Sequence, residues 1–242
     1  MIILAAGMPR AGSGWHFNLV HDLVKTAGGS DSRWIREHYR LQSILTEVNC
    51  NIGVLSARRL ALLLLPVVQG KTFVIKAHAS PTSSWRLLSS LGILRTTYIS
   101  RDPRDAMLSA FEYGKRSLER GRPNAFSHLT DFETSLDFMR RYVQIWAAWH
   151  RQKGVHRMRY EDLLMNYLPE ARKLAGFLGL DADAPNVIAV IETHQPEMVQ
   201  GEQGFHFHRG KIGRYRTAYS ADEQARLASA FGDVLPTMGY SV

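Results

Sequence analysis

The chain has 242 residues, with 30 Lys and Arg against 22 Asp and Glu, a formal net charge of +8 and 45% hydrophobic residues. This length can bury one α/β core, so we expect residues 1–242 to form a single domain. One cysteine, Cys50, excludes an internal disulfide and fits a reducing compartment, the cytoplasm. The positive balance indicates an anionic partner: a nucleotide, phosphate or sulfate, a nucleic acid or an acidic membrane surface.

The first fifteen residues predict a strand, a glycine-rich turn and the start of a helix. Residues 2–6 are an apolar run typical of a buried strand, and Gly7, Gly12 and Gly14 then interrupt regular structure. An apolar repeat of helical period begins at Ser13. A turn between a strand and a helix offers unpaired backbone N–H groups and the positive end of the helix dipole. We therefore expect it to bind a phosphate.

The turn departs from the phosphate loop of nucleoside triphosphatases. That loop places Lys and then Ser or Thr directly after its second glycine, whereas Ser13 and Gly14 follow Gly12 here. The nearest cation stands earlier, at Arg10. A kinase or nucleotide hydrolase would lack its phosphate-bridging lysine, and a turn without any ligand is the simpler alternative.

The rest of the chain alternates strand and helix patterns. Further strands are expected at 72–77, 96–100 and 155–160, and helices in parts of 33–65, at 85–91, from Pro103, and at 131–150, 169–178, 186–192 and after Ser220. The basic segment 115–124 is expected to be a loop. The longest apolar run, 60–68, is too short to span a bilayer and is expected to be a buried helix end. The alternation predicts an α/β fold with a central, mostly parallel sheet and helices on both faces.

Polar residues follow each expected strand. Lys76 and His78 end one strand, Arg101 follows the next, and Arg159 with Tyr160 ends the last. Ligands of open parallel sheets bind beyond the carboxyl ends of the strands, so we expect these residues to meet the glycine-rich turn there. Such a pocket suits a flat ring that carries more than one anionic group.

Five short segments carry the most specific pattern. Residues 9–15 read PRAGSGW, 75–78 IKAH, 101–109 RDPRDAMLS, 159–162 RYED and 209–213 RGKIG. In this order they resemble motifs of the cytosolic sulfotransferases, which use 3′-phosphoadenosine 5′-phosphosulfate (PAPS). The corresponding family segments are Pro-Lys-Ser-Gly-Thr-Thr-Trp, Lys-Thr-His, an Arg with a Ser eight positions on, Tyr-Glu-Asp, and Arg-Lys-Gly-x-x-Gly. Arg10 stands in place of the family's lysine.

The resemblance implies a P-loop-like fold, PAPS as sulfuryl donor, 3′-phosphoadenosine 5′-phosphate (PAP) as product, and no metal. It makes His78 the general base, with Lys76 and Arg10 neutralising the departing oxygen. The implied nucleotide-binding residues are Arg10, Ala11, Gly12, Ser13, Gly14, Trp15, Arg101, Ser109, Tyr160, Arg209, Gly210 and Lys211. Among them Arg101, Ser109 and Arg209 would bind the 3′-phosphate. The acceptor would be a hydroxyl or amine of a small molecule or carbohydrate.

Two other functions compete with this interpretation. A P-loop kinase or nucleotide hydrolase would bind ATP or GTP with magnesium, and a basic polyanion-binding module would use residues 115–122. The chain has no recognised nucleic-acid motif, and its cations stand at strand ends rather than along one helix. We therefore expect no nucleic-acid partner and no membrane span, and the sequence predicts no oligomeric state.

Overall fold

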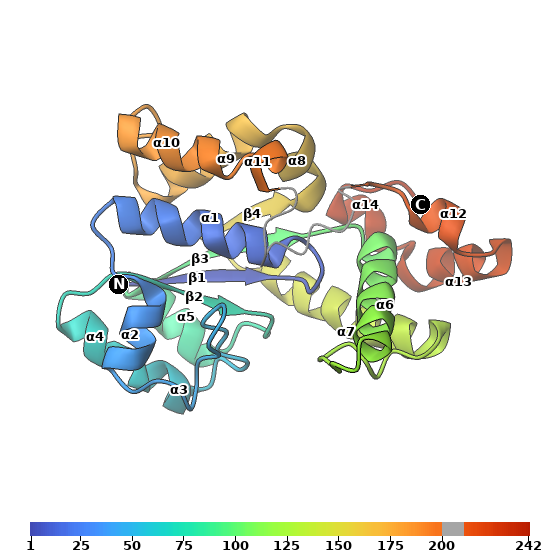
Figure 1. The fold of residues 1–242 in the computed structure, drawn as a ribbon, viewed down its shortest axis with the longest axis horizontal. Coiled ribbons are helices and arrows are strands. Elements are labelled where there is room, and N and C mark those ends of the chain that lie inside the picture. The colour runs from blue at the N-terminus through green and yellow to red at the C-terminus, as the bar shows by residue number, and fades with distance from the viewer. Residues whose placement is uncertain (200–210) are drawn as a thin grey trace.

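The computed structural model describes residues 1–199 and 211–242. In this part of the chain four parallel strands form one sheet in the order β2-β1-β3-β4. The strands are β1 (Ile2–Gly7), β2 (Phe73–Ala77), β3 (Leu94–Ser100) and β4 (Val155–Arg159). β1 is buried along its whole length because it lies inside the sheet and helices cover it. The expected parallel sheet is therefore confirmed, and all strands end on the side where the glycine-rich turn begins (Figure 1).

Helices cover both faces of the sheet (Figure 1). α1 (Ser13–Thr26) lies on one face and packs against α9 (Tyr167–Leu178) and α10 (Pro185–Thr193). α5 (Ser83–Ser90) and α7 (Phe132–His150) lie on the other face, where Trp149 contacts Trp85 and Tyr98. The other helices are α2 (Ser32–His38), α3 (Ala57–Leu62), α4 (Leu64–Val68), α6 (Pro103–Glu119), α8 (Tyr160–Met165), α11 (Pro196–Val199), α12 (Tyr215–Ala218), α13 (Ala221–Phe231) and α14 (Leu235–Met238).

The predicted loop at 115–124 is wrong over its first half. α6 continues to Glu119, and the chain turns at Gly121, whose φ is 64°. Lysine, arginine and leucine are good helix formers, and Arg116 pairs with Glu112 one turn earlier, at 3.7 Å. A run of basic residues therefore extended the helix instead of ending it.

The apolar run 60–68 is also only partly buried, contrary to the expectation. Leu60, Leu63 and Pro66 face the core, whereas Leu62, Leu65 and Val68 are exposed. Pro66 has no backbone N–H and cannot continue a helix from the preceding turn, so the run splits into the short helices α3 and α4. Among the described residues no helix is long and apolar enough to cross a membrane.

Two glycines inside helices give a matched test of the packing. A Cβ on Gly114 in α6 would lie 2.2 Å from the carbonyl oxygen of Phe126, whereas a Cβ on Gly176 in α9 would meet nothing within 4 Å. Gly114→Ala should therefore lower the free energy of unfolding by about 1–3 kcal/mol through overpacking. Gly176→Ala should raise it by about 0.5–1 kcal/mol, because alanine has the higher helix propensity. Urea unfolding followed by circular dichroism measures both, and effects of the same sign would contradict this packing.

Candidate active site

The turn between β1 and α1 presents backbone amides at the C-terminal end of the sheet. Gly12 is the N-cap of α1, with φ 71° and no side-chain cap. A Cβ at Gly12 would lie 2.7 Å from the ring of Tyr160, so only glycine fits between the helix start and that ring. Ala11 is fully buried, and Ser13 and Gly14 open the helix. The turn thus has the uncapped helix start on which the expected phosphate site depends.

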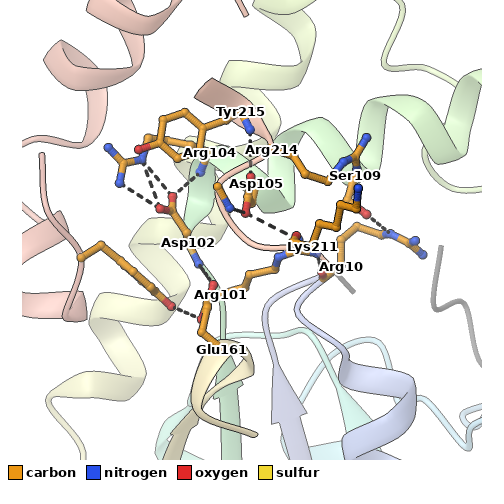
Figure 2. Close-up of polar contacts among 12 residues, drawn as sticks. Arg10, Arg101, Asp102, Arg104, Asp105, Ser109, Glu161, Lys211, Arg214 and Tyr215 are labelled. Carbon is orange, nitrogen blue, oxygen red and sulfur yellow. Dashed lines mark hydrogen bonds and ion pairs between the residues drawn. The ribbon is translucent and has the colours of Figure 1, made fainter. Parts of the chain in front are cut away.

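Arg10 extends from this turn to α6. Its backbone is left-handed, with φ 63°. The Nε of Arg10 donates to the hydroxyl of Ser109 at 3.3 Å (Figure 2). The guanidinium of Arg10 lies 4.3 Å from the ring centre of Tyr113. Burial, with the nearby charges of Arg101 and Arg116, lowers the pKa of Arg10 to about 10. Arg10 and Ser109, expected at different phosphates of the nucleotide, are therefore in direct contact.

Lys76 and His78 lie together at the end of β2. Lys76 is 6% exposed, and burial together with the charge of Arg10 lowers its pKa to about 8. His78 Nδ1 lies 2.6 Å from the carbonyl oxygen of Gly7. A carbonyl only accepts hydrogen bonds, so this contact assigns the proton to Nδ1 and leaves the Nε2 lone pair available. Burial and the charge of Lys76 lower the pKa of His78 to about 3, so its imidazole is neutral at pH 7.

Arg101 begins directly after β3 and connects the elements of the site. Its guanidinium donates to the carbonyl oxygens of Arg10, at 3.2 Å, and Lys211, at 3.3 Å. It lies 3.7 Å from the carboxylate of Asp105 and 4.6 Å from the ring centre of Tyr160. The Nε of Arg101 is buried and has no hydrogen-bond partner among the described residues. A buried donor without a partner is costly, and an anion bound at this position would satisfy it.

Asp105 is a residue of this site that the sequence analysis missed. Its carboxylate accepts hydrogen bonds from the backbone N–H groups of Gly213, at 2.6 Å, and Tyr215, at 3.0 Å (Figure 2). Arg214, between them, forms an ion pair with Glu112. Asp105 lies in the first turn of α6, where the helix dipole favours a negative charge. Asp105 thereby holds the chain that follows residue 210 against the start of α6, next to Arg101.

A second layer of polar contacts lies behind Arg101. Asp102 caps α6 and forms an ion pair with Arg104 at 2.8 Å. Its backbone N–H donates to Glu161 at 3.1 Å, and the Tyr240 hydroxyl donates to the other oxygen of Glu161 at 2.7 Å (Figure 2). Burial raises the pKa of Glu161, although both hydrogen bonds oppose that shift. These contacts fix the start of α6 and hence the position of Arg101.

The two aromatic residues among the expected nucleotide-binding residues, Trp15 and Tyr160, make contacts within the protein. Trp15 is 2% exposed, stacks on Tyr167 with ring centres 5.7 Å apart, and donates its indole N–H to the carbonyl oxygen of His194 at 2.8 Å. One face of Trp15 is thus covered by the ring of Tyr167. Tyr160 lies beneath Arg101 and beside Gly12.

Four other predicted residues do not bring a side chain into this site within the described residues. Arg159 pairs with Asp162 at 2.6 Å and donates to Gly239, so its charge is directed to the C-terminal segment and away from the nucleotide site. Lys211 contributes its carbonyl oxygen to Arg101, and its side chain is exposed. Arg209 and Gly210 lie outside the described residues. In residues 1–199 and 211–242 no group of three or more His, Cys, Asp or Glu could hold a metal ion.

A sulfotransferase domain matches residues 2–211, and the chain therefore belongs to the sulfotransferase family. Its fold is similar to a retinol dehydratase solved with androsterone and inactive cofactor PAP, with a TM-score of 0.61 at 18% identity over 96% of this chain and 80% of that one. It is also similar to mouse sulfotransferase SULT7A1 solved with PAP, with a TM-score of 0.58 at 13% identity over 97% and 84%. No curated protein matches the sequence. The family expected from the five motifs is confirmed.

Proposed function

We propose that this protein transfers a sulfuryl group from PAPS to a hydroxyl or amine of a small-molecule or carbohydrate acceptor. Family membership supports the reaction class. The observation that carries the nucleotide assignment is the buried, unpartnered Nε of Arg101, next to the uncapped start of α1. Two structures of similar fold were solved with PAP. The proposal includes a single domain, no metal and a cytoplasmic location, the last supported by the resemblance to cytosolic sulfotransferases.

The residues of the site fit a nucleotide with two phosphate groups. The amides of Gly12, Ser13, Gly14 and Trp15 would hold the 5′-phosphate, because the first N–H groups of a helix have no partner within it. Arg101 and Ser109 would bind the 3′-phosphate, with Arg209 from the segment outside the described residues. Adenine would lie beside Trp15 and Tyr160. PAPS, when bound, supplies a sulfuryl group on a bridging oxygen that departs with PAP.

His78 would act as the general base, and Lys76 would stabilise the negative charge of the leaving group. The Nε2 of His78 accepts the proton of the acceptor hydroxyl, and the Nδ1–H bond to Gly7 keeps the imidazole in the tautomer that allows this. Lys76 stabilises the negative charge that develops on the departing oxygen. Because Lys76 is almost fully buried, its charge acts in a medium with little water to screen it.

The pKa of Lys76 predicts a loss of activity at alkaline pH. Before any ligand binds, this pKa is about 8, so the free enzyme increasingly lacks the charge above that pH. We expect kcat/KM for PAPS to fall above about pH 8, by about tenfold per pH unit for a single deprotonation. In Lys76→Arg, whose guanidinium keeps its proton, this decline should move to higher pH. A wild-type profile that stays flat well above this pH would contradict the role of Lys76.

Calorimetry and a transfer assay together test the proposed function. PAP should bind to one site per chain without magnesium, and radiolabelled sulfate should move from PAPS to members of an acceptor panel. ATP with magnesium is the control ligand, and a preference for it would favour the kinase alternative. Binding of duplex DNA that weakens steeply with salt, in the absence of any PAP affinity, would instead favour a polyanion-binding module.

A further inference from the structure

Helices α3, α4 and α5 expose a set of large apolar side chains, here called the apolar strip. Its members are Leu62, Leu65, Val68, Leu87 and Leu91, which are between 46% and 84% exposed. α3 contacts both α4 and α5, so Leu62, Leu65, Val68 and Leu87 stand on neighbouring helices, and Leu91 directly follows α5. The three helices lie at the end of the molecule away from α6 and the nucleotide site (Figure 1). Single exposed leucines are ordinary, but several on adjoining helices indicate an interaction surface.

The same part of the sequence carries only positive charge. No Asp or Glu occurs between Glu47 and Asp102, whereas seven basic residues do: Arg58, Arg59, Lys71, Lys76, Arg86, Arg95 and Arg101. Arg58 and Arg86 are exposed on α3 and α5, the helices that carry the strip. Lys71, just after α4, places its ammonium 5.7 Å from the ring centre of Trp34, which is itself half-exposed. Residues 48–101 therefore give this surface aliphatic and cationic groups without acidic ones. α2 adds Trp34 and also Glu37, whose carboxylate pairs with Arg36.

This combination identifies one kind of partner. A second copy of the chain, docked about a two-fold axis, would bring Arg58 and Arg86 toward the same cations of its partner. An anionic lipid surface instead attracts the cations, accepts leucine and valine side chains below the headgroups, and accommodates Trp34 at headgroup level. We propose that the apolar strip docks this protein on the surface of an anionic bilayer, without crossing it.

Co-sedimentation with lipid vesicles tests the proposal. The full chain should sediment with vesicles of phosphatidylcholine and phosphatidylserine but remain largely unbound with phosphatidylcholine alone. The bound fraction should fall as salt is added, because the attraction to the surface is screened. The proposal would be overturned if the wild-type protein bound neither kind of vesicle. It would also be overturned if light scattering showed a dimer that Leu65→Asp dissociates.

Exposed substitutions locate the contact. The double variant Leu65→Asp/Val68→Asp should lower vesicle partitioning at least about tenfold, because it places charge where apolar groups insert. Arg58→Gln/Arg86→Gln should lower it about tenfold and flatten the salt dependence. Met165→Asp is the matched control, since Met165 is 76% exposed on α8, outside the strip. Circular dichroism checks the fold of each variant. Equal losses in the control and the strip variants would place the contact elsewhere and reject this surface.

Discussion

His78→Ala is expected to lower kcat by about a hundredfold to ten-thousandfold while leaving the affinity for PAP nearly unchanged. The reason is local: the carbonyl oxygen of Gly7 holds the Nδ1–H of His78, so Nε2 is the basic nitrogen. Alanine removes that nitrogen without altering the backbone turn that would bind the nucleotide. Single-turnover sulfuryl transfer gives the rate, and calorimetry with PAP gives the affinity.

A second histidine and the pH profile separate the base role from a structural one. His150→Ala, at the exposed end of α7, should have no effect on turnover. Because the pKa of His78 is lowered to about 3, the free enzyme keeps a neutral base below the usual histidine pKa. Wild-type kcat/KM should therefore stay level on acidification through about pH 6.5, the value for an unperturbed imidazole. Full turnover in His78→Ala would refute the assignment.

The sheet and the convergence of the site were predictable because both follow from short-range patterns. Buried parallel strands favour continuous apolar runs, and residues 2–6 and 73–75 supply them. In a parallel sheet all carboxyl ends lie on one side, so Lys76, His78 and Arg101 had to meet near the glycine-rich turn. The same logic would hold for any chain with this alternation, whatever its family.

The orientation of single side chains was not predictable in this way. Arg10 replaces a lysine in the family motif, and only the coordinates show its guanidinium on Ser109 and Tyr113. Asp105 holds backbone N–H groups more than a hundred positions away, at Gly213 and Tyr215, and no local period encodes such a pairing. The links between Glu161, Asp102 and Tyr240 are of the same long-range kind.

The errors in secondary structure have a common cause. The segment 115–124 is basic and contains Gly121 and Pro123, but lysine and arginine favour helices, and α6 accordingly runs on to Glu119. The run 60–68 is apolar, but Pro66 interrupts the helical hydrogen bonds and the run splits at Leu63, which leaves Leu62 and Leu65 exposed. In both cases composition was a poor guide to conformation, and the exposed leucines belong to the proposed lipid-binding surface.

Arg101→Met is expected to remove the preference of the protein for PAP over 5′-AMP, which lacks the 3′-phosphate. Hydrogen bonds between a buried guanidinium and a phosphate are charge-assisted, so wild type should bind PAP about tenfold to a hundredfold more tightly than 5′-AMP. The buried Nε of Arg101 has no hydrogen-bond acceptor among the described residues, so it is available to a phosphate. In the variant both nucleotides should bind with similar, weaker affinity. Calorimetric titration of each nucleotide into each protein measures the two ratios.

The comparison of two ligands on one variant also controls for damage to the fold. Arg101 donates hydrogen bonds to the carbonyl oxygens of Arg10 and Lys211, and its loss can disturb both segments. Such a disturbance would weaken the binding of both nucleotides to the same extent. A uniform loss cancels in the ratio of PAP to 5′-AMP affinity, whereas loss of the 3′-phosphate contact does not. Arg120→Met, an exposed arginine just beyond α6, should keep the wild-type ratio. An undiminished preference for PAP in Arg101→Met would show that another cation binds the 3′-phosphate, and the role of Arg101 would then be confined to holding the two neighbouring segments together.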